Sequence, residues 1–457
     1  MSSKHEKLSI PKMIVLGLQH MFAMFGATIL VPLLSGLSVQ VTLVGVGVGT
    51  LIFHLFAKGR VPAFLGSSFA FLVGIRLITD PTAGIFPAVM EDGYVRIQQS
   101  MQGLAAGSLV TAEAFRDATL AYATGGILVS GLMYVLFAII IKFVGVKTFM
   151  KFVPITVTAP TVILIGIMLA PFAISQSSEN LLLAVVTLGL VIAAASWGRG
   201  MIKIIPILLG IAGAYILAVI LHNIGFTNHD NSPIIDFAAA STRVGTGLVG
   251  LPPFMMPRFN PIAIMIMIPF ALATIAEHIG DMVALGSITK EDFVEDPGLS
   301  NTLLGDGVAS MFSGFIGGAA STTYGENVGV VALTKVFNPR VVQVAAIFAT
   351  VLAFSPIFAA VIYSIPNAII GGASFMLYGM IAAVGVRNLV DNKVDLSKTK
   401  NLTVVAIMLV TGLGLRFGPA ITFTIGTTSV PIDRLGIAIA VVLGVVLNII
   451  LPDESNE

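Results

Sequence analysis

The sequence predicts an all-α polytopic membrane protein, and three observations carry this prediction. Of the 457 residues, 56 % are hydrophobic and only 10 % are charged, whereas soluble domains carry about 25 % charged residues. The mean hydropathy is +0.99. Apolar runs of roughly 18–25 residues recur along the chain, which is the length of a helix that crosses a hydrocarbon layer of about 30 Å. The chain is therefore expected to lie in a lipid bilayer.

Fourteen apolar runs are candidate transmembrane segments. In chain order they cover residues 11–34, 39–57, 61–77, 117–144, 152–175, 180–198, 204–222, 261–288, 299–316, 318–335, 340–364, 366–388, 401–417 and 433–451. The third and tenth runs are rich in Gly, Ser and Thr and poor in the bulky aliphatic residues that cover a lipid-facing helix. Non-helical backbone is tolerated at membrane depth only where protein or a cavity surrounds it. We expect these two runs to be interrupted and to face the inside of the protein.

The basic residues predict the orientation. If the N-terminus is cytoplasmic, all 13 lysines lie on the inner side, and 17 of the 24 Lys and Arg residues lie inside against 7 outside. This bias obeys the positive-inside rule. Both termini are expected to be cytoplasmic, with the protein in the inner or plasma membrane. Two outer loops, 78–116 and 223–260, are long, and the first is expected to hold a short amphipathic helix.

The fourteen spans divide into two sets of seven near residue 240. An odd number of spans per half gives the halves opposite orientations in the membrane, which is the inverted repeat of many secondary transporters. The third span of each half holds one of the interrupted stretches, PAFLGSSFAF and GGAASTTYGENVG. Paired interruptions at matching positions indicate a substrate site. Close packing of helices through small residues is the alternative.

Two glutamates lie inside otherwise apolar spans. Glu277 belongs to IMIMIPFALATIAEHIGDMVALGSI, and Glu326 belongs to the second interrupted stretch. An ionisable side chain at membrane depth costs about 2.5–3.5 kcal/mol on insertion scales, and such residues are by default functional. We therefore expect both carboxyl groups to converge, from opposite halves of the chain, on one buried polar chamber that holds a solute.

His278 and Asp281 accompany Glu277. On a helix Asp281 lies one turn from Glu277 on the same face, whereas His278 is rotated by about 100°. His278 is interpreted either as a hydrogen-bonding residue between helices or as a substrate contact. Asp281 is interpreted as a proton-relay partner, a ligand to water in the site, or a helix–helix hydrogen bond. Further ligands at metal-binding spacing are missing, so we expect neither a metal nor a cofactor.

The predicted chamber favours a small, planar, neutral solute. Two carboxylates repel anions but accept N–H donors, while backbone amides donate to carbonyls. Pyrimidines and oxopurines present both kinds of group along one edge. Phe69 and Tyr324 are candidates for the wall of the chamber, and the backbone N–H of Gly325 is a candidate hydrogen-bond donor to the solute. Because burial and a neighbouring carboxylate both favour proton uptake, proton coupling is a hypothesis, with Glu277, Asp281 and His278 as its candidates.

At these residues the chain resembles the nucleobase:ascorbate transporter family, also called nucleobase–cation symporter 2, and most closely its bacterial uracil permeases. The stretches that carry the resemblance are LQHMFAMFGATILVP (18–32), GRVPAFLGSSFAF (59–71), PFALATIAEHIGD (269–281), STTYGENVGVVALTKV (321–336) and GGASFMLYGMIAAVGVRNLV (371–390). They extend over nearly the whole chain, and the AEH and TTYGEN motifs are specific.

The resemblance implies two domains, each built from both halves. The core domain comprises residues 1–145 (spans 1–4) and 241–365 (spans 8–11). The gate domain comprises residues 146–240 (spans 5–7) and 366–457 (spans 12–14). Short antiparallel strands are expected in spans 3 and 10. Relatives dimerise, so a homodimer is expected.

The resemblance also implies the roles of the site residues. Glu277 and Glu326 hydrogen-bond the nucleobase, the main-chain amides of Phe69 and Gly325 meet its carbonyls, and Tyr324 lies nearby. Relatives of the xanthine and urate type tend to carry Gln where Glu326 stands, so Glu326 indicates the uracil branch. Asp281 stands where the best-known uracil permease has His, and a role of that His does not transfer to this chain.

The sequence as a whole predicts a proton-coupled uracil importer that works by alternating access and serves pyrimidine salvage. It is not expected to be an enzyme, although Ser67 and Ser68 beside Gly66 could mimic a serine nucleophile. A xanthine or urate permease of the same family is the alternative, followed by an anion transporter of similar architecture. Its partners are expected to be uracil and protons, and no nucleic acid.

Overall fold

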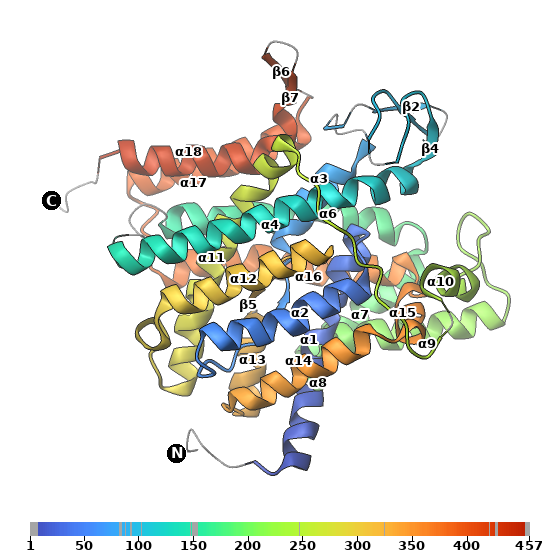
Figure 1. The fold of residues 1–457 in the computed structure, drawn as a ribbon, viewed down its shortest axis with the longest axis horizontal. Helices are drawn as coiled ribbons and strands as arrows, with labels where there is room; N and C mark the ends of the chain where they lie inside the picture. The colour runs from blue at the N-terminus through green and yellow to red at the C-terminus, as the bar shows by residue number, and fades with distance from the viewer. Residues whose placement is uncertain are drawn as a thin grey trace.

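Long helices form most of the structure, a computed structural model that describes residues 8–81, 85–86, 88–91, 94–101, 103–146, 148, 154–245, 247–323, 325–419, 421–425 and 428–452. The first half contains α1 (Ile10–Ser35), α2 (Val39–Phe56), β1 (Leu65–Ser67), α3 (Ala70–Thr79), β2 (Ala88–Glu91), β3 (Tyr94–Ile97), β4 (Leu109–Thr111), α4 (Ala112–Val144), α6 (Ile155–Ser177), α7 (Leu181–Trp197), α8 (Met201–Ile204) and α9 (Pro206–Asn223) (Figure 1).

The second half begins with the short α10 (Phe237–Val244). It continues with α11 (Pro261–Thr289), the π-helical turn η2 (Val294–Gly298), α12 (Leu299–Ile316), β5 (Ser321–Thr323), α13 (Gly325–Thr334), α14 (Pro339–Ala353), α15 (Pro356–Tyr363), α16 (Asn367–Asp391), α17 (Thr399–Phe417), β6 (Thr422–Ile425), β7 (Thr428–Pro431), the 3₁₀ turn η3 (Ile432–Leu435) and α18 (Gly436–Ile450).

Eight helices of the described chain are long and apolar enough to cross a membrane, and a ninth span results if α14 and α15, bent by 85°, are taken together. Helices α3, α7 and α18 are apolar but shorter. The third predicted span is short because β1 replaces its first half, and the tenth is short because β5 precedes α13. The chain is thus a multi-span helical protein, and the number fourteen stays a prediction.

Turn and capping residues set the helix boundaries. Helix α1 ends at Gly36, whose φ of 86° is left-handed, and Ser38 caps α2 by accepting a hydrogen bond from the N–H of Val41. Asn260 caps α11 through its side-chain oxygen, which accepts from two backbone N–H groups, and Pro261 occupies the first helical position. Proline is favoured there because its missing N–H needs no partner.

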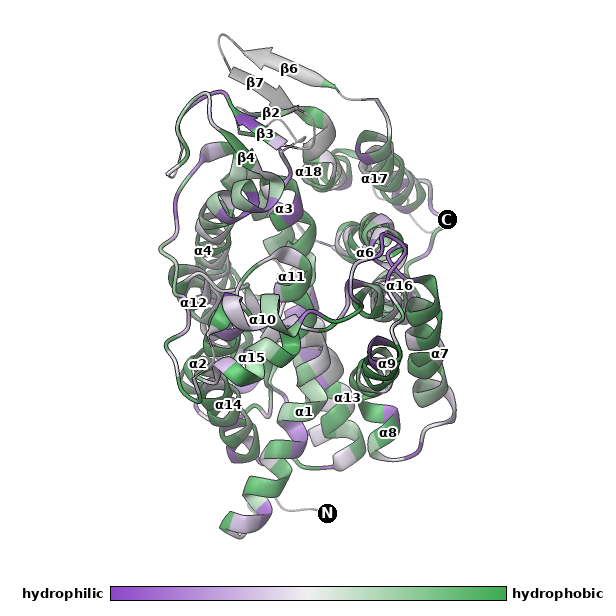
Figure 2. Ribbon diagram, turned by 90° about the vertical axis from the view of Figure 1, so that its right-hand side faces the viewer, coloured by the Kyte–Doolittle hydropathy of each residue, from purple (hydrophilic) through white to green (hydrophobic). Residues whose placement is uncertain are grey.

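The helices pack as two groups. In one group α12 lies against α2 and α4, α14 lies against α1 and α2, and α11 lies against α4. In the other group α6 packs most extensively on α16, α7 packs on α9 and α16, and α17 packs on α18 and α6. Figure 2 shows α2, α4, α12 and α14 on one side and α6, α7, α9, α16 and α17 on the other, with α1, α3 and α11 between them.

The described residues of 78–116, the first predicted outer loop, form a sheet. Strands β2, β3 and β4 pair in that order as an antiparallel sheet, so the expected amphipathic helix in 78–116 is wrong for the described residues. The reason is visible in Val95-Arg96-Ile97: Val95 and Ile97 are fully buried while Arg96 is not. This alternation with a period of two is typical of a strand with one buried face.

The second predicted outer loop, residues 223–260, crosses three helices of the first group. Its extended part donates backbone hydrogen bonds from Gly250 to Phe354 (2.9 Å), from Met255 to Ile316 (3.1 Å) and from Arg258 to Ala121 (2.8 Å). These acceptors lie at or near α14, α12 and α4. The loop is therefore attached through its backbone. In Figure 1 it is the yellow-green connecting segment that leads from α10 to α11.

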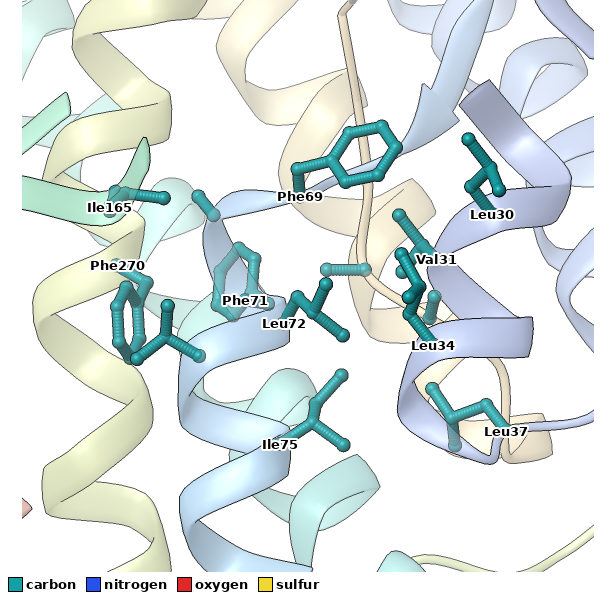
Figure 3. Packing of buried hydrophobic residues seen from close by; sticks show 14 of the residues in the cluster. Leu30, Val31, Leu34, Leu37, Phe69, Phe71, Leu72, Ile75, Ile165 and Phe270 are labelled. Atoms are coloured by element: carbon teal, nitrogen blue, oxygen red, sulfur yellow. The ribbon is translucent and has the colours of Figure 1, made fainter. Parts of the chain in front are cut away.

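Helix α3 is held by α11 and α1. The rings of Phe71 and Phe270 lie 6.1 Å apart at 54°, and Figure 3 shows Leu72 and Ile75 on the side of α3 that faces Val31 and Leu34 of α1. All of these side chains are buried. Because packed interiors tolerate little displacement, α3 and the strand that precedes it have a fixed place beside α11.

Candidate functional site

Two short strands from opposite halves of the chain meet inside the protein. β1 and β5 pair antiparallel, with Leu65 opposite Thr323, Gly66 opposite Thr322 and Ser67 opposite Ser321. All six residues are buried. The N–H of Ser68 extends the pairing by donating to the carbonyl of Ala320 at 2.8 Å. The backbone is thus extended at membrane depth, and pairing supplies the partners that lipid cannot.

A helix begins directly after each strand. Phe69 is the N-cap residue of α3, which starts at Ala70, and α13 starts at Gly325. The first N–H groups of a helix have no intrahelical partner and carry the positive end of the helix dipole. Because the two strands are antiparallel, these two N-termini lie at opposite ends of the strand pair. They are suited to donate hydrogen bonds to carbonyl oxygens of a solute.

Neighbouring side chains fix the strands. The hydroxyl of Ser67 donates to the carbonyl of Thr28 at 2.8 Å, and the N–H of Leu65 donates to the hydroxyl of Thr50 at 3.0 Å. On the other strand Ser310 donates to the carbonyl of Ser321. Helices α1, α2 and α12 therefore all hold the strand pair. Ser67 is engaged with backbone and has the surroundings of a structural residue.

Helix α11 supplies the acidic residues of the first motif. Glu277 is partly exposed, whereas Asp281 is buried with 8 % exposure. The Asp281 carboxylate lies near α13, with Oδ1 3.8 Å from the position of a Cβ added to Gly325. The structure thus brings Asp281 and Gly325 together. It describes the main chain of Glu326 within α13, while Tyr324 and the Glu326 side chain lie outside its described parts.

His278, rotated by about 100° from Glu277 on α11, points into a polar network. Its Nδ1 lies 3.1 Å from the hydroxyl of Thr323 and 3.1 Å from Oδ2 of Asp306. Its Nε2 lies 3.0 Å from the hydroxyl of Thr302. Thr322 donates to the same Asp306 oxygen at 3.0 Å. Since both ring nitrogens are engaged, His278 joins α11, α12 and β5, as expected for a hydrogen-bonding residue between helices.

Asp306 is a member of this network that the sequence did not predict. Its side chain is fully buried, and so is that of His278. His278 and Asp306 therefore both contact β5, the strand that leads to Gly325. His278 directly follows Glu277 in the chain. A buried pair of this kind is costly to break because the remaining partner is left uncompensated. Hydrogen bonds from His278 to Thr323 and from Thr322 to Asp306 thus connect the segment of Glu277 with the strand that precedes Glu326.

The motif Gly305-Asp306-Gly307 explains how this carboxylate reaches the network. A Cβ on Gly305 would lie 3.1 Å from the Phe53 backbone, and one on Gly307 would lie 2.9 Å from the carbonyl oxygen of Gly131. Helix α12 therefore touches α2 on one side of Asp306 and α4 on the other. An aspartate between two glycines in an apolar span was the signal that could have identified it.

This close approach leads to a stability prediction. Gly307→Ala is expected to lower the free energy of unfolding by about 1–3 kcal/mol, because the added methyl group overpacks the contact between α12 and α4. Thermal unfolding in detergent measures the effect. Gly189→Ala in α7 is the control, since nothing lies within 4 Å of its added Cβ and alanine favours a helix interior. Equal melting temperatures for Gly307→Ala and the unaltered protein would contradict the packing described.

Comparison with known proteins places the chain in a family. A model of the permease family matches residues 11–421. The uracil permease of Bacillus subtilis is 35 % identical over 459 residues, which cover 96 % of this chain and 92 % of the relative. The uracil permease of Bacillus caldolyticus is 34 % identical over 99 % of this chain and 94 % of the relative. That of Escherichia coli K12 is 32 % identical over 97 % and 92 %.

The chain belongs to the permease family of nucleobase:ascorbate transporters, as its motifs indicated. It is therefore a multi-pass membrane transporter, and relatives that are named permeases are consistent with a protein that is not an enzyme.

Solved structures of similar fold are transporters as well. The transmembrane domain of a cyanobacterial bicarbonate transporter has a TM-score of 0.58 and 18 % identity, over 97 % of this chain and 98 % of that domain. The murine anion transporter Slc26a9 has a TM-score of 0.60 and 12 % identity, over 97 % of this chain and 69 % of that one. At these identities the likeness concerns the fold alone.

Proposed function

We propose that the protein imports uracil together with protons across the inner or plasma membrane. The observation that carries this proposal is the buried strand pair, at whose ends two helix N-termini lie, one of them beside an acidic face of α11. Three full-length relatives that are named uracil permeases support the same substrate. A xanthine or urate permease stays the alternative, and an anion transporter is disfavoured by the acidic groups of the site.

Uracil fits the chemistry proposed for this site. Its ring N–H groups are donors, and the carboxylates of Glu277 and Glu326 are assigned as their acceptors. Its carbonyl oxygens are acceptors, and the main-chain amides of Phe69 and Gly325 are assigned as their donors. Tyr324 and the ring of Phe69 form the wall. Charge-assisted hydrogen bonds of this kind discriminate strongly against analogues that lack a matching group.

The proposed mechanism is alternating access between two domains. The two helix groups described above support a core domain of residues 1–145 and 241–365 and a gate domain of residues 146–240 and 366–457. The proposed arrangement has fourteen spans in two inverted sets of seven, with both termini on the side that carries all the lysines, the cytoplasmic side. Movement of one domain against the other then exposes the site to each side in turn. A homodimer is part of the proposal because relatives dimerise and the gate helices expose large apolar faces.

Glu277 and Asp281 are better proton carriers than His278. Both nitrogens of His278 already have hydrogen-bond partners in the buried network, so a change in its protonation would disturb the strand. Asp281 lies next to Gly325, and Glu277 is partly exposed on the neighbouring turn. We assign the coupled proton to this acidic face of α11.

Uptake by proteoliposomes tests the proposal. The purified protein is expected to accumulate labelled uracil when the outside is more acidic, and unlabelled uracil should compete far better than xanthine. Collapse of the pH gradient with a protonophore should abolish accumulation but leave equilibrium exchange. Uptake that ignores the gradient would exclude proton symport, and stronger competition by xanthine would favour the purine alternative.

A further inference from the structure

One face of α3 connects the predicted site to the second helix group. Phe69, Val73, Arg76 and Leu77 follow the spacing of residues that share a helix face. Val73 and Leu77 line a cavity of about 10 Å³ together with Met168 of α6 and Gly436 of α18. This volume holds about one water molecule. Beyond the site, α3 is thus closely apposed to helices of the proposed gate domain.

Arg76 lies on this face, at the outer end of α3. Its guanidinium carbon is 4.9 Å from the centre of the Phe172 ring, which belongs to the last turns of α6. The charge of Asp80 acts favourably on this cation, and that of Arg116 acts against it. A guanidinium group over an aromatic face is attracted by the ring quadrupole, most strongly where water is excluded.

The contact between Arg76 and Phe172 lies between the two domains that are proposed to move during transport. Arg76 and Phe172 come from the core and gate domains proposed above, and both lie near the ends of their helices that the lysine distribution places outside. Any movement that opens the site to the outside must separate α3 from α6. The cation–π contact can therefore exist only while the outer side is closed.

We propose that Arg76 and Phe172 form an outer latch, which stabilises the outward-closed state and opens when α3 moves away from α6. This inference rests on the alternating-access mechanism proposed above. It adds a pair of residues that determine the balance between states without touching the substrate. Loss of either member should shift the population toward the outward-open state.

The absence of cysteine from the sequence makes a labelling experiment possible without background. Val73→Cys places a thiol on the closed face, at a side chain that is only 2 % exposed. Its reaction with a membrane-impermeant maleimide, added outside right-side-out vesicles, measures how often that face opens. We expect Arg76→Leu in this background to raise the labelling rate at least about fivefold, and Phe172→Leu to do the same.

Three further variants sharpen the test. The double variant should label no faster than either single variant, because both remove the same contact. Arg76→Lys should label at an intermediate rate, since it keeps the charge but loses the planar group. Arg243→Leu is the matched control: it removes a cation–π contact of the same kind, 4.4 Å from the Tyr363 ring, between α10 and α15, and should leave the rate unchanged.

Labelling requires no substrate, so its outcome is independent of uracil uptake by the unaltered protein. Unchanged labelling in Arg76→Leu, with Phe172→Leu also unchanged, would overturn the latch even if uracil is transported. Faster labelling in Arg76→Leu alone would also overturn it, because Phe172 would then not be the partner. Monodispersity in detergent confirms that each variant is folded.

Discussion

Glu277→Gln is expected to reduce uracil uptake at least about tenfold, and up to about a hundredfold, at saturating pH gradient. The substitution keeps the size of the side chain but replaces a charged carboxylate, the assigned acceptor of one uracil N–H, by a neutral amide. Hydrogen bonds to charged groups contribute about 1.5–3 kcal/mol each, which corresponds to this range. Initial rates of labelled uracil uptake in proteoliposomes measure the loss, together with uracil binding by calorimetry.

A control variant and the melting temperature distinguish a loss of uracil binding from a loss of folding. Glu113→Gln, at an exposed position in the first turn of α4, is a matched control that should transport normally. The melting temperature of Glu277→Gln without uracil should remain close to that of the unaltered protein, while its increase on adding uracil should disappear. Normal binding and transport by Glu277→Gln would show that the assigned site is wrong.

Asp306→Ala is expected to have the largest effect on folding and uptake together. It removes the acceptor of both His278 and Thr322 and leaves polar groups buried without compensation. Each buried polar group left without its partner costs about 1–3 kcal/mol, so the melting temperature should fall by several degrees and uptake should be lost. Thermal unfolding in detergent and uptake of labelled uracil are the two measurements.

Asp306→Asn is the conservative variant to compare with Asp306→Ala. Its amide oxygen can still accept from Thr322, so it should restore much of the stability that Asp306→Ala loses. In a double-mutant cycle with His278→Asn, the two substitutions should be strongly non-additive, because they share one interaction. Additive effects, or a stable and fully active Asp306→Ala, would show that the pair does not hold β5.

The sequence predicted the helical segments well because their cause is local. Long apolar runs between charged residues define helices such as α2, expected at 39–57 and found at Val39–Phe56. The interrupted third and tenth runs were likewise visible as local composition, and the structure has β1 and β5 there. The sheet in the outer loop was missed because its strands are short, and only the alternation at Val95–Ile97 marks one of them.

The network behind the site was harder to predict because its members come from three elements. Nothing in the neighbourhood of Asp306 indicates that His278 lies beside it, since 27 intervening positions and a turn separate them. The role of Gly305 and Gly307 becomes visible only from the contacts of α12 with α2 and α4. Sequence patterns report burial and periodicity along one element, whereas such a pair depends on how elements pack.

The pairing of β1 with β5 has a consequence for biogenesis. During synthesis the ribosome delivers β1 to the membrane long before β5 exists, so the peptide groups of Leu65–Ser67 initially lack their final partners. Unpaired peptide groups cannot remain in hydrocarbon. The nascent third segment must therefore wait in the translocon, at the interface or as a transient helix, and the first half made alone should be retained by quality control.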